Sequence, residues 1–131
     1  MHTLASTFTP PSLHAGGLRY HGMAPMVSHL RELGLIEASA FPQTECFDAG
    51  SLFARTEGIV PAPEANHAVA CAIEEALRCK QEGRSQVILF SLSGHGHFDM
   101  SAYQSFAADK LTDLLYEKED LARSLAALPT V

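Results

Sequence analysis

The chain lacks tryptophan, and it carries little charge for its length of 131 residues. Charged residues make up 18% of the sequence, against about 25% in ordinary soluble domains. Apolar residues make up 47%, and the length suits one domain with its own core. A surface this poor in charge is expected to bury apolar area against a partner, and we expect a homo-oligomer. An ordinary compact enzyme domain is the alternative that composition leaves open.

Basic clusters, long apolar runs and a targeting segment are also missing. The net charge is −6, and no group of Lys and Arg could neutralise phosphates, which argues against a nucleic-acid partner. No run approaches the roughly 18 apolar residues that cross a bilayer, which argues against a membrane protein. The opening MHTLASTFTPPS has neither the basic nor the apolar part of a secretory signal. We expect a cytoplasmic protein.

Cysteine is scarce, and its spacing fits neither a disulfide framework nor a CxxC motif. The three cysteines are Cys46, Cys71 and Cys79. Cys71 and Cys79 fall on one predicted helix, about 12 Å apart along its axis, which is too far for a disulfide. Reduced thiols agree with a cytoplasmic location.

Helical spacing of apolar residues is present over much of the chain. The residues before the first helix, 1–24, are rich in Pro and Gly and predict a loop. Apolar periodicity, Pro at helix starts and Gly at helix ends predict helices over 25–33, over 44–56, from Glu64 to the residue before Gly83, and over about 99–111, with a helical tail at 113–131.

Two short segments predict strands. Residues 35–41 alternate between apolar and polar, and residues 86–92 contain four successive large apolar side chains. Such a run is typical of a parallel strand that is covered on both faces. The pattern predicts a single α/β domain over 1–131, with a three-layer α/β/α arrangement around a partial parallel sheet. Two strands are too few for a complete doubly wound sheet, so we expect part of one.

The turn SGHGHFD follows the second predicted strand. Gly94 and Gly96 free the backbone where ligands bind in open parallel sheets, beyond the carboxyl ends of the strands. His95, His97 and Asp99 have side chains that could hold a metal ion. A glycine-rich turn with solvated histidines is the simpler interpretation, and the residues alone leave both open.

Three longer strings carry a family resemblance. LHAGGLRYHGMAP (13–25), ECFDAGSLFARTEGIVPAPEANHAVA (45–70) and VILFSLSGHGHFDM (87–100) occur in this order. Together, over about residues 4–112, they resemble the carboxyl-terminal part of the tryptophan synthase beta chain, in its divergent second branch. The resemblance implies a pyridoxal-phosphate enzyme of fold type II, a lyase that performs β-replacement and makes L-tryptophan from L-serine and indole.

The resemblance also implies roles for individual residues. Ser93 matches the serine that hydrogen-bonds the pyridine nitrogen of pyridoxal 5'-phosphate, and Gly94 lets the backbone approach the ring edge. A neutral hydroxyl leaves that nitrogen largely unprotonated, which moderates the electron sink. Glu57 matches a glutamate at the other edge of the cofactor. Without the motif, Glu57 is simply a surface residue at a helix end.

A monovalent cation site is implied as well. Leu18, Tyr20 and Gly22 match positions whose backbone carbonyls bind such an ion, and carbonyl oxygens suit hard cations. Two positions depart from the main branch of the family. Arg19 stands where that branch has an aspartate that pairs with an arginine on closure, which argues against the main-branch closing mechanism in this chain. His95 replaces an arginine of the main branch.

The catalytic lysine of the family has no counterpart in this chain. Its three lysines, Lys80, Lys110 and Lys118, lack the family's histidine-lysine context, and the glycine-rich phosphate cradle is missing too. Two hypotheses follow. The chain is the carboxyl-terminal cofactor-site portion of a tryptophan synthase beta chain, inactive alone and completed by the amino-terminal portion, or it is a non-catalytic folded module kept for binding or assembly. The pocket residues Glu57 and Ser93 favour the first.

Overall fold

The computed structural model describes residues 1–114 and 118–128. The chain forms two compact units. Unit 1 contains residues 1–12, residues 17–40 and the carboxyl-terminal segment from 114, and unit 2 contains residues 13–16 and 41–113. Within residues 1–114 and 118–128, none of the helices combines the length and apolar character that a bilayer crossing requires.

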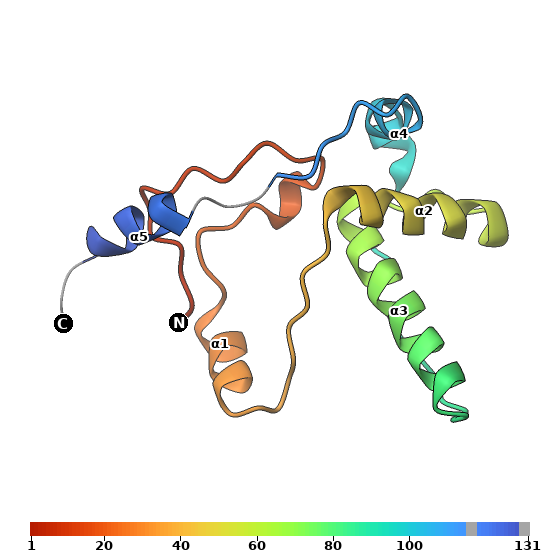
Figure 1. Cartoon of the computed structure of the whole chain (residues 1–131), viewed down its shortest axis with the longest axis horizontal. Coiled ribbons are helices and arrows are strands. Elements are labelled where there is room, and N and C mark those ends of the chain that lie inside the picture. Colours follow the sequence, from red (N-terminus) through yellow and green to blue (C-terminus); the bar gives the residue numbers. More distant parts are fainter. Residues whose placement is uncertain (115–117, 129–131) are drawn as a thin grey trace. The chain divides into compact units, whose positions relative to one another are not determined.

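Unit 2 is built on three α-helices and a short 3₁₀ helix. They are α2 (Gln43–Glu57), α3 (Pro63–Gln81), the 3₁₀ helix η2 (Gly96–Asp99) and α4 (Met100–Ala107). Figure 1 shows α2 and α3 as a crossing pair with α4 beside α2. The helices predicted over 44–56 and from Glu64 are confirmed within a residue or two, whereas the one predicted over about 99–111 is shorter.

Local chemistry sets the ends of α2 and α3. Gly58 adopts a left-handed conformation, with φ of 74°, and its N–H bonds the Ala54 carbonyl at 3.1 Å, which ends α2. Pro63 occupies the first turn of α3, where a missing N–H costs nothing. The four residues 59–62 that join the two helices therefore leave α2 in a fixed direction.

The core of unit 2 lies between α2 and α3. Ala49, Val69 and Ala70 are buried there, and Phe53 and Phe90 pack against them with their rings in an edge-to-face contact at 5.9 Å. Gly50 allows α2 and α3 to approach closely, because a Cβ atom at this position would lie 2.1 Å from Asn66 Oδ1. Small residues thus set the separation of α2 and α3.

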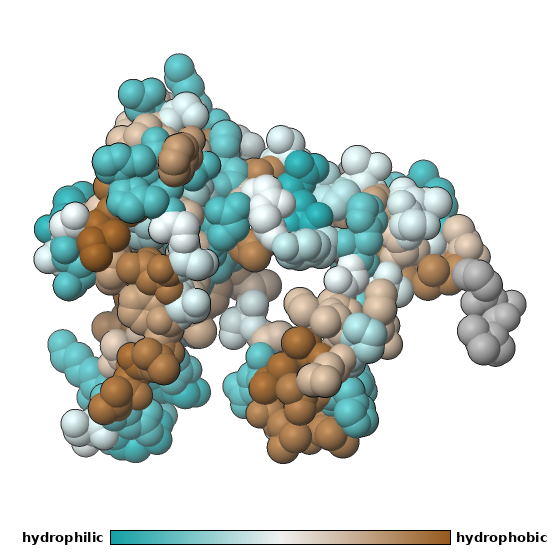
Figure 2. Space-filling model, turned by 180° about the vertical axis from the view of Figure 1, so that it is seen from behind, coloured by the Kyte–Doolittle hydropathy of each residue, from teal (hydrophilic) through white to brown (hydrophobic). Residues whose placement is uncertain are grey.

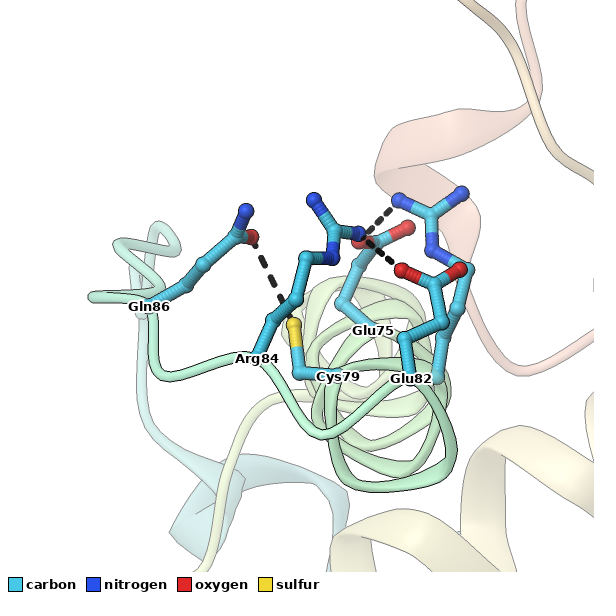
Figure 3. Close-up of polar contacts among 6 residues, drawn as sticks. Glu75, Cys79, Glu82, Arg84 and Gln86 are labelled. Carbon is cyan, nitrogen blue, oxygen red and sulfur yellow. Dashed lines mark hydrogen bonds and ion pairs between the residues drawn. The ribbon is translucent and has the colours of Figure 1, made fainter.

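Polar contacts stabilise the carboxyl end of α3, where the chain turns toward residues 84–92 (Figure 3). The Cys79 thiol donates to Gln86 Oε1 at 3.4 Å. Arg84 forms an ion pair with Glu82, and its N–H bonds the Cys79 carbonyl at 2.9 Å. These contacts direct the following segment back along α3 toward the core.

Unit 1 contains α1 (Pro25–Glu32), the 3₁₀ helix η1 (Gly16–Leu18) at its border and α5 (Lys118–Ala126). The helix predicted over 25–33 is confirmed by α1. An antiparallel bridge joins Thr3 to Gly22, flanked by the bond from the Met23 N–H to the His2 carbonyl at 3.0 Å. Part of the predicted tail, 113–131, lies outside the described residues, and α5 accounts for its described helical part.

The predicted parallel sheet requires a correction. Neither 35–41 nor 86–92 forms a strand, and the described residues contain one isolated β-bridge and no sheet. Residues 86–92 nevertheless keep a strand-like alternation: Val87 and Leu89 are 99% and 96% exposed, whereas Phe90 packs on the core. Within the described chain, no backbone group from 87 through 94 makes a hydrogen bond. A strand needs a neighbour, and this stretch has none here.

Candidate functional site

The site is formed where residues 93–97 meet the connection between α2 and α3. The Gly96 N–H donates to the Val60 carbonyl at 2.9 Å. A Cβ atom at Gly96 would lie 2.5 Å from the Pro61 carbonyl oxygen, and one at Gly94 would lie 3.0 Å from Ala62 Cβ. The two sequence motifs predicted to flank a cofactor, EGIVPAPE and SGHGHFD, are therefore in direct contact within unit 2.

Gly94 has a backbone conformation that few other residues adopt, with φ of +73°. The positive φ and the tight contact to Ala62 both disfavour a side chain at position 94. The turn thus presents bare backbone directly after Ser93, as the sequence predicts for a place where a flat ligand approaches the main chain.

Ser93 and Glu57 both face solvent at this site. Glu57 is the last residue of α2, three residues before Val60, and Ser93 lies three residues before Gly96. Neither side chain makes a hydrogen bond or an ion pair with the described residues. A hydroxyl with free donor capacity beside bare backbone fits the ring nitrogen and ring edge of pyridoxal phosphate.

The two histidines of the turn interact with each other. His95 Nδ1 accepts a bond from the His97 N–H at 3.2 Å, and the two rings meet edge to face with centroids 4.3 Å apart. His95 thereby caps η2. Among residues 1–114 and 118–128, no group of three or more His, Cys, Asp or Glu side chains is arranged to hold a metal ion. The geometry assigns His95 a structural contact and gives no support to a metal centre with Asp99.

A buried polar network lies beneath the site, and sequence reasoning missed it. The Tyr103 hydroxyl lies 2.7 Å from the Pro61 carbonyl oxygen and 3.1 Å from Asn66 Oδ1, and Asn66 Nδ2 donates to it at 3.0 Å. Because the hydroxyl carries one hydrogen, the shorter contact to Pro61 takes it. Asn66 is fully buried, and burial raises the pKa of Tyr103. Asn66 shares a helix face with Val69 and Ala70, and a polar residue on that apolar face is the signal that could have revealed the network.

The predicted cation loop belongs to unit 1. The Leu18 carbonyl, at the end of η1, accepts a bond from the Tyr20 N–H at 3.1 Å. Gly22 forms the bridge with Thr3. The preceding residue, His21, donates from Nε2 to the Phe8 carbonyl at 2.8 Å. The Arg19 guanidinium donates a hydrogen bond to the Pro10 carbonyl at 2.9 Å and thereby stabilises the conformation of this loop. The three predicted carbonyls thus come from an ordered turn.

Comparison with known proteins gives the chain its relatives. It is 59% identical over 113 residues to tryptophan synthase beta chain 2 of Aquifex aeolicus, covering 86% of this chain and 26% of the relative. It is 58% identical over 111 residues to tryptophan synthase beta chain 2 of Methanosarcina mazei, covering 85% and 25%. The tryptophan synthase beta chain of Thermococcus onnurineus is 55% identical over 121 residues, covering 92% and 27%. No protein-family model matches the chain.

These relatives confirm the resemblance drawn from the three sequence strings. The chain is homologous to part of the tryptophan synthase beta chain, and several of the relatives bear the name of its second form. The chain spans about a quarter of the length of the curated relatives that it matches.

Proposed function

We propose that the chain supplies the carboxyl-terminal cofactor-site portion of a tryptophan synthase beta-like enzyme of fold type II. The reaction is a β-replacement that joins L-serine and indole into L-tryptophan with pyridoxal 5'-phosphate. The observation that carries the proposal is the bond from the Gly96 N–H to the Val60 carbonyl, which brings the Ser93 turn against the segment that follows Glu57. The sequence identity of the relatives supports the same conclusion.

Each proposed residue contributes a simple interaction. The Ser93 hydroxyl donates to the pyridine nitrogen, and Gly94 leaves room for the ring edge because position 94 carries no side chain. Glu57 borders the opposite edge. The bound cofactor supplies an electron sink, and a neutral hydroxyl partner keeps that sink moderate, which favours replacement over transamination.

The remaining parts of the site must come from another segment. Lys80 and Lys110 are exposed, as is Lys118 at the start of α5, and none neighbours the Ser93 turn in sequence. We propose that the amino-terminal portion of a beta chain provides the Schiff-base lysine and the phosphate cradle, and that the present chain is inactive alone. The unpaired backbone of 87–94 supports a partner that pairs with it.

Backbone carbonyls of Leu18, Tyr20 and Gly22 are proposed to bind a monovalent cation in the completed enzyme. Support comes from the ordered turn that contains them and from the hard oxygen donors that such ions prefer. The completed enzyme is proposed to be a cytoplasmic homo-oligomer.

A non-catalytic folded module is the second candidate. One observation favours it: the three lysines of the sequence lack the family's histidine-lysine context. A module kept only for binding or assembly has no need of the Ser93 hydroxyl or of a side-chain-free position 94, and for this reason the enzyme portion is the better proposal.

Complementation tests the proposal. The chain is co-expressed with the amino-terminal three quarters of a related beta chain, and cofactor absorbance and tryptophan formation are measured. Borohydride reduction and peptide mapping then locate the modified lysine, which should lie in the complementing segment. Cofactor bound stoichiometrically at Lys80, Lys110 or Lys118 would contradict the proposal, as would an assembled complex that binds no cofactor.

A further inference from the structure

Three helices of unit 2 meet at one buried amide. Asn66 on α3 is fully buried, and Gly50 on α2 lies so close that a Cβ atom there would be 2.1 Å from Asn66 Oδ1. Tyr103 on α4 completes the contact through its hydroxyl, which Asn66 Nδ2 bonds at 3.0 Å. The Tyr103 ring is itself held edge to face on Phe47, with centroids 5.0 Å apart.

This network ends on the backbone of the site. The Tyr103 hydroxyl donates to the Pro61 carbonyl at 2.7 Å, and the neighbouring Val60 carbonyl accepts the Gly96 N–H at 2.9 Å. Two adjacent carbonyls are thus bonded from two directions, one by α4 and one by the turn that follows Ser93. A movement of the Val60 or Pro61 carbonyl away from its donor would break one of these bonds.

We infer that Asn66 and Tyr103 are positioning residues that set the spacing between the Glu57 end of α2 and the Ser93–Gly94 turn. The inference rests on the proposed function, because these two places are the proposed edges of the cofactor site. Neither residue reaches the cofactor in this assignment. They act through the Pro61 and Val60 carbonyls.

A purely structural role explains the choice of residues less well. The neighbours of Asn66 on its helix face, Val69 and Ala70, are apolar and buried, and an apolar residue of similar volume there would avoid the cost of burying an amide. A polar side chain is needed only if the Tyr103 hydroxyl must be oriented toward the Pro61 carbonyl. The amide does this, because its N–H occupies a lone pair of the hydroxyl and leaves the hydrogen for Pro61.

Amide hydrogen exchange of the Gly96 N–H in the 131-residue chain tests the inference without the cofactor. Tyr103→Phe removes the hydroxyl and keeps the ring on Phe47. We expect the Gly96 amide to exchange at least about tenfold faster, and the amides of α3 to change no more than in the control Ile73→Val, which trims the same core without touching the network. Asn66→Ser, whose hydroxyl is too short to replace the amide, should speed Gly96 exchange as well.

The second readout is the dissociation constant of pyridoxal phosphate in the complemented assembly. Tyr103→Phe should weaken binding by about tenfold, whereas Ile73→Val should leave it unchanged. Gly96 exchange that is the same in Tyr103→Phe and Ile73→Val overturns the inference and leaves the proposed function standing. Faster exchange with unchanged cofactor affinity also overturns it. A wild-type assembly that binds no cofactor overturns the proposed function, and the positioning role with it.

Discussion

At the scale of single residues, Ser93 is the side chain on which the proposed chemistry depends most directly. Ser93→Ala should preserve the fold, because the residue is exposed and its hydroxyl makes no bond with the described chain. In the complemented enzyme the change leaves the ring nitrogen without a partner, at about 1–3 kcal/mol, so β-replacement should slow by about ten- to a hundredfold. Steady-state turnover and cofactor absorbance measure this.

Two further variants sharpen the Ser93 experiment. Ser93→Asp places an anion at the ring nitrogen, which favours its protonation and a stronger electron sink, so transamination should rise relative to replacement. Ser91→Ala, an exposed serine two residues earlier, is the matched control and should be silent. Equal turnover in wild type and Ser93→Ala would show that residues 93–97 are only a turn.

Burial strongly perturbs the ionisation of Cys46. Its side chain is 1% exposed, and burial, with smaller contributions from Glu45 and Asp113, raises the pKa of its thiol to about 12. The pKa of a thiol in the unfolded chain is about 8.5. Because the pKa of Cys46 is higher in the folded state, its contribution to stability is complete below about pH 8.5 and is lost as the pH rises toward 12. Unfolding free energy should therefore decline above about pH 8.5, and less steeply in Cys46→Ala than in Cys71→Ala. Urea titrations across this pH range measure it, and identical slopes in the two variants would contradict the assignment.

At the scale of elements, the start of α2 depends on a residue from far along the sequence. Pro42 precedes α2 and provides no side-chain cap. The Asp113 carboxylate caps the helix instead. It accepts hydrogen bonds from the Thr44 N–H at 3.0 Å and from the Thr44 hydroxyl at 2.6 Å. These bonds lower the pKa of Asp113. The carboxylate thus stabilises the amino-terminal end of a helix dipole from outside that helix.

Asp113→Ala should lower the unfolding free energy of unit 2 by about 0.5–2 kcal/mol. Because the folded pKa is depressed, the stabilisation is complete above the unfolded pKa of about 3.9 and disappears as the pH falls through the folded pKa. Wild type and variant should therefore converge in stability under acid conditions. Asp48→Ala, on the exposed face of α2, serves as the control, and a difference between wild type and Asp113→Ala that persists at the lowest pH would argue against the cap.

The elements also show which parts of the fold the sequence could predict. Helices form from contacts three and four residues apart, so periodicity, Pro25 and Gly58 located α1 and α2 to within a residue or two. The strand at 86–92 depends on pairing with another segment, and the described chain offers none. The apolar character of residues 86–92 can be read from the sequence, but the prediction that they form a strand of a parallel sheet is wrong for the described chain.

The candidate site divides in the same way. Ser93 and Gly94 stand out in the sequence because a glycine turn follows an apolar run, and the role proposed for them comes from the resemblance to the family. Asn66 and Tyr103 are 37 residues apart, and no local pattern links them. Their bond follows from the packing of α3 and of α4 against α2, which only the three-dimensional structure provides.

At the scale of the whole molecule, exposed apolar side chains determine how strongly the chain associates with other molecules. Figure 2 shows apolar surface over the region of α3 and the segment that follows it, where Leu77, Val87 and Leu89 are exposed. An unpaired backbone beside apolar side chains is a template for association. We expect the chain alone to bind an apolar dye and to increase in mass with concentration in sedimentation experiments.

Leu89→Lys should reduce both the dye binding and the association, because a charge on the exposed side of the segment opposes pairing. Met26→Lys is the matched control, since Met26 is also exposed but lies on α1 in unit 1. A compact monomer at every concentration, together with no dye binding, would contradict the expectation.

The unpaired backbone of residues 87–94 also determines how many partners each chain can bind through backbone hydrogen bonds. An extended segment has two edges, and both are open within the described chain, so each molecule is bivalent in backbone pairing. Adding one copy at one edge leaves the other edge free, and contacts that do not close by rotation continue into open-ended assemblies. A complementing polypeptide that provides a strand at each edge would stop this growth at one-to-one stoichiometry. The partner proposed to complete the site would thus also end the polymerisation of the chain.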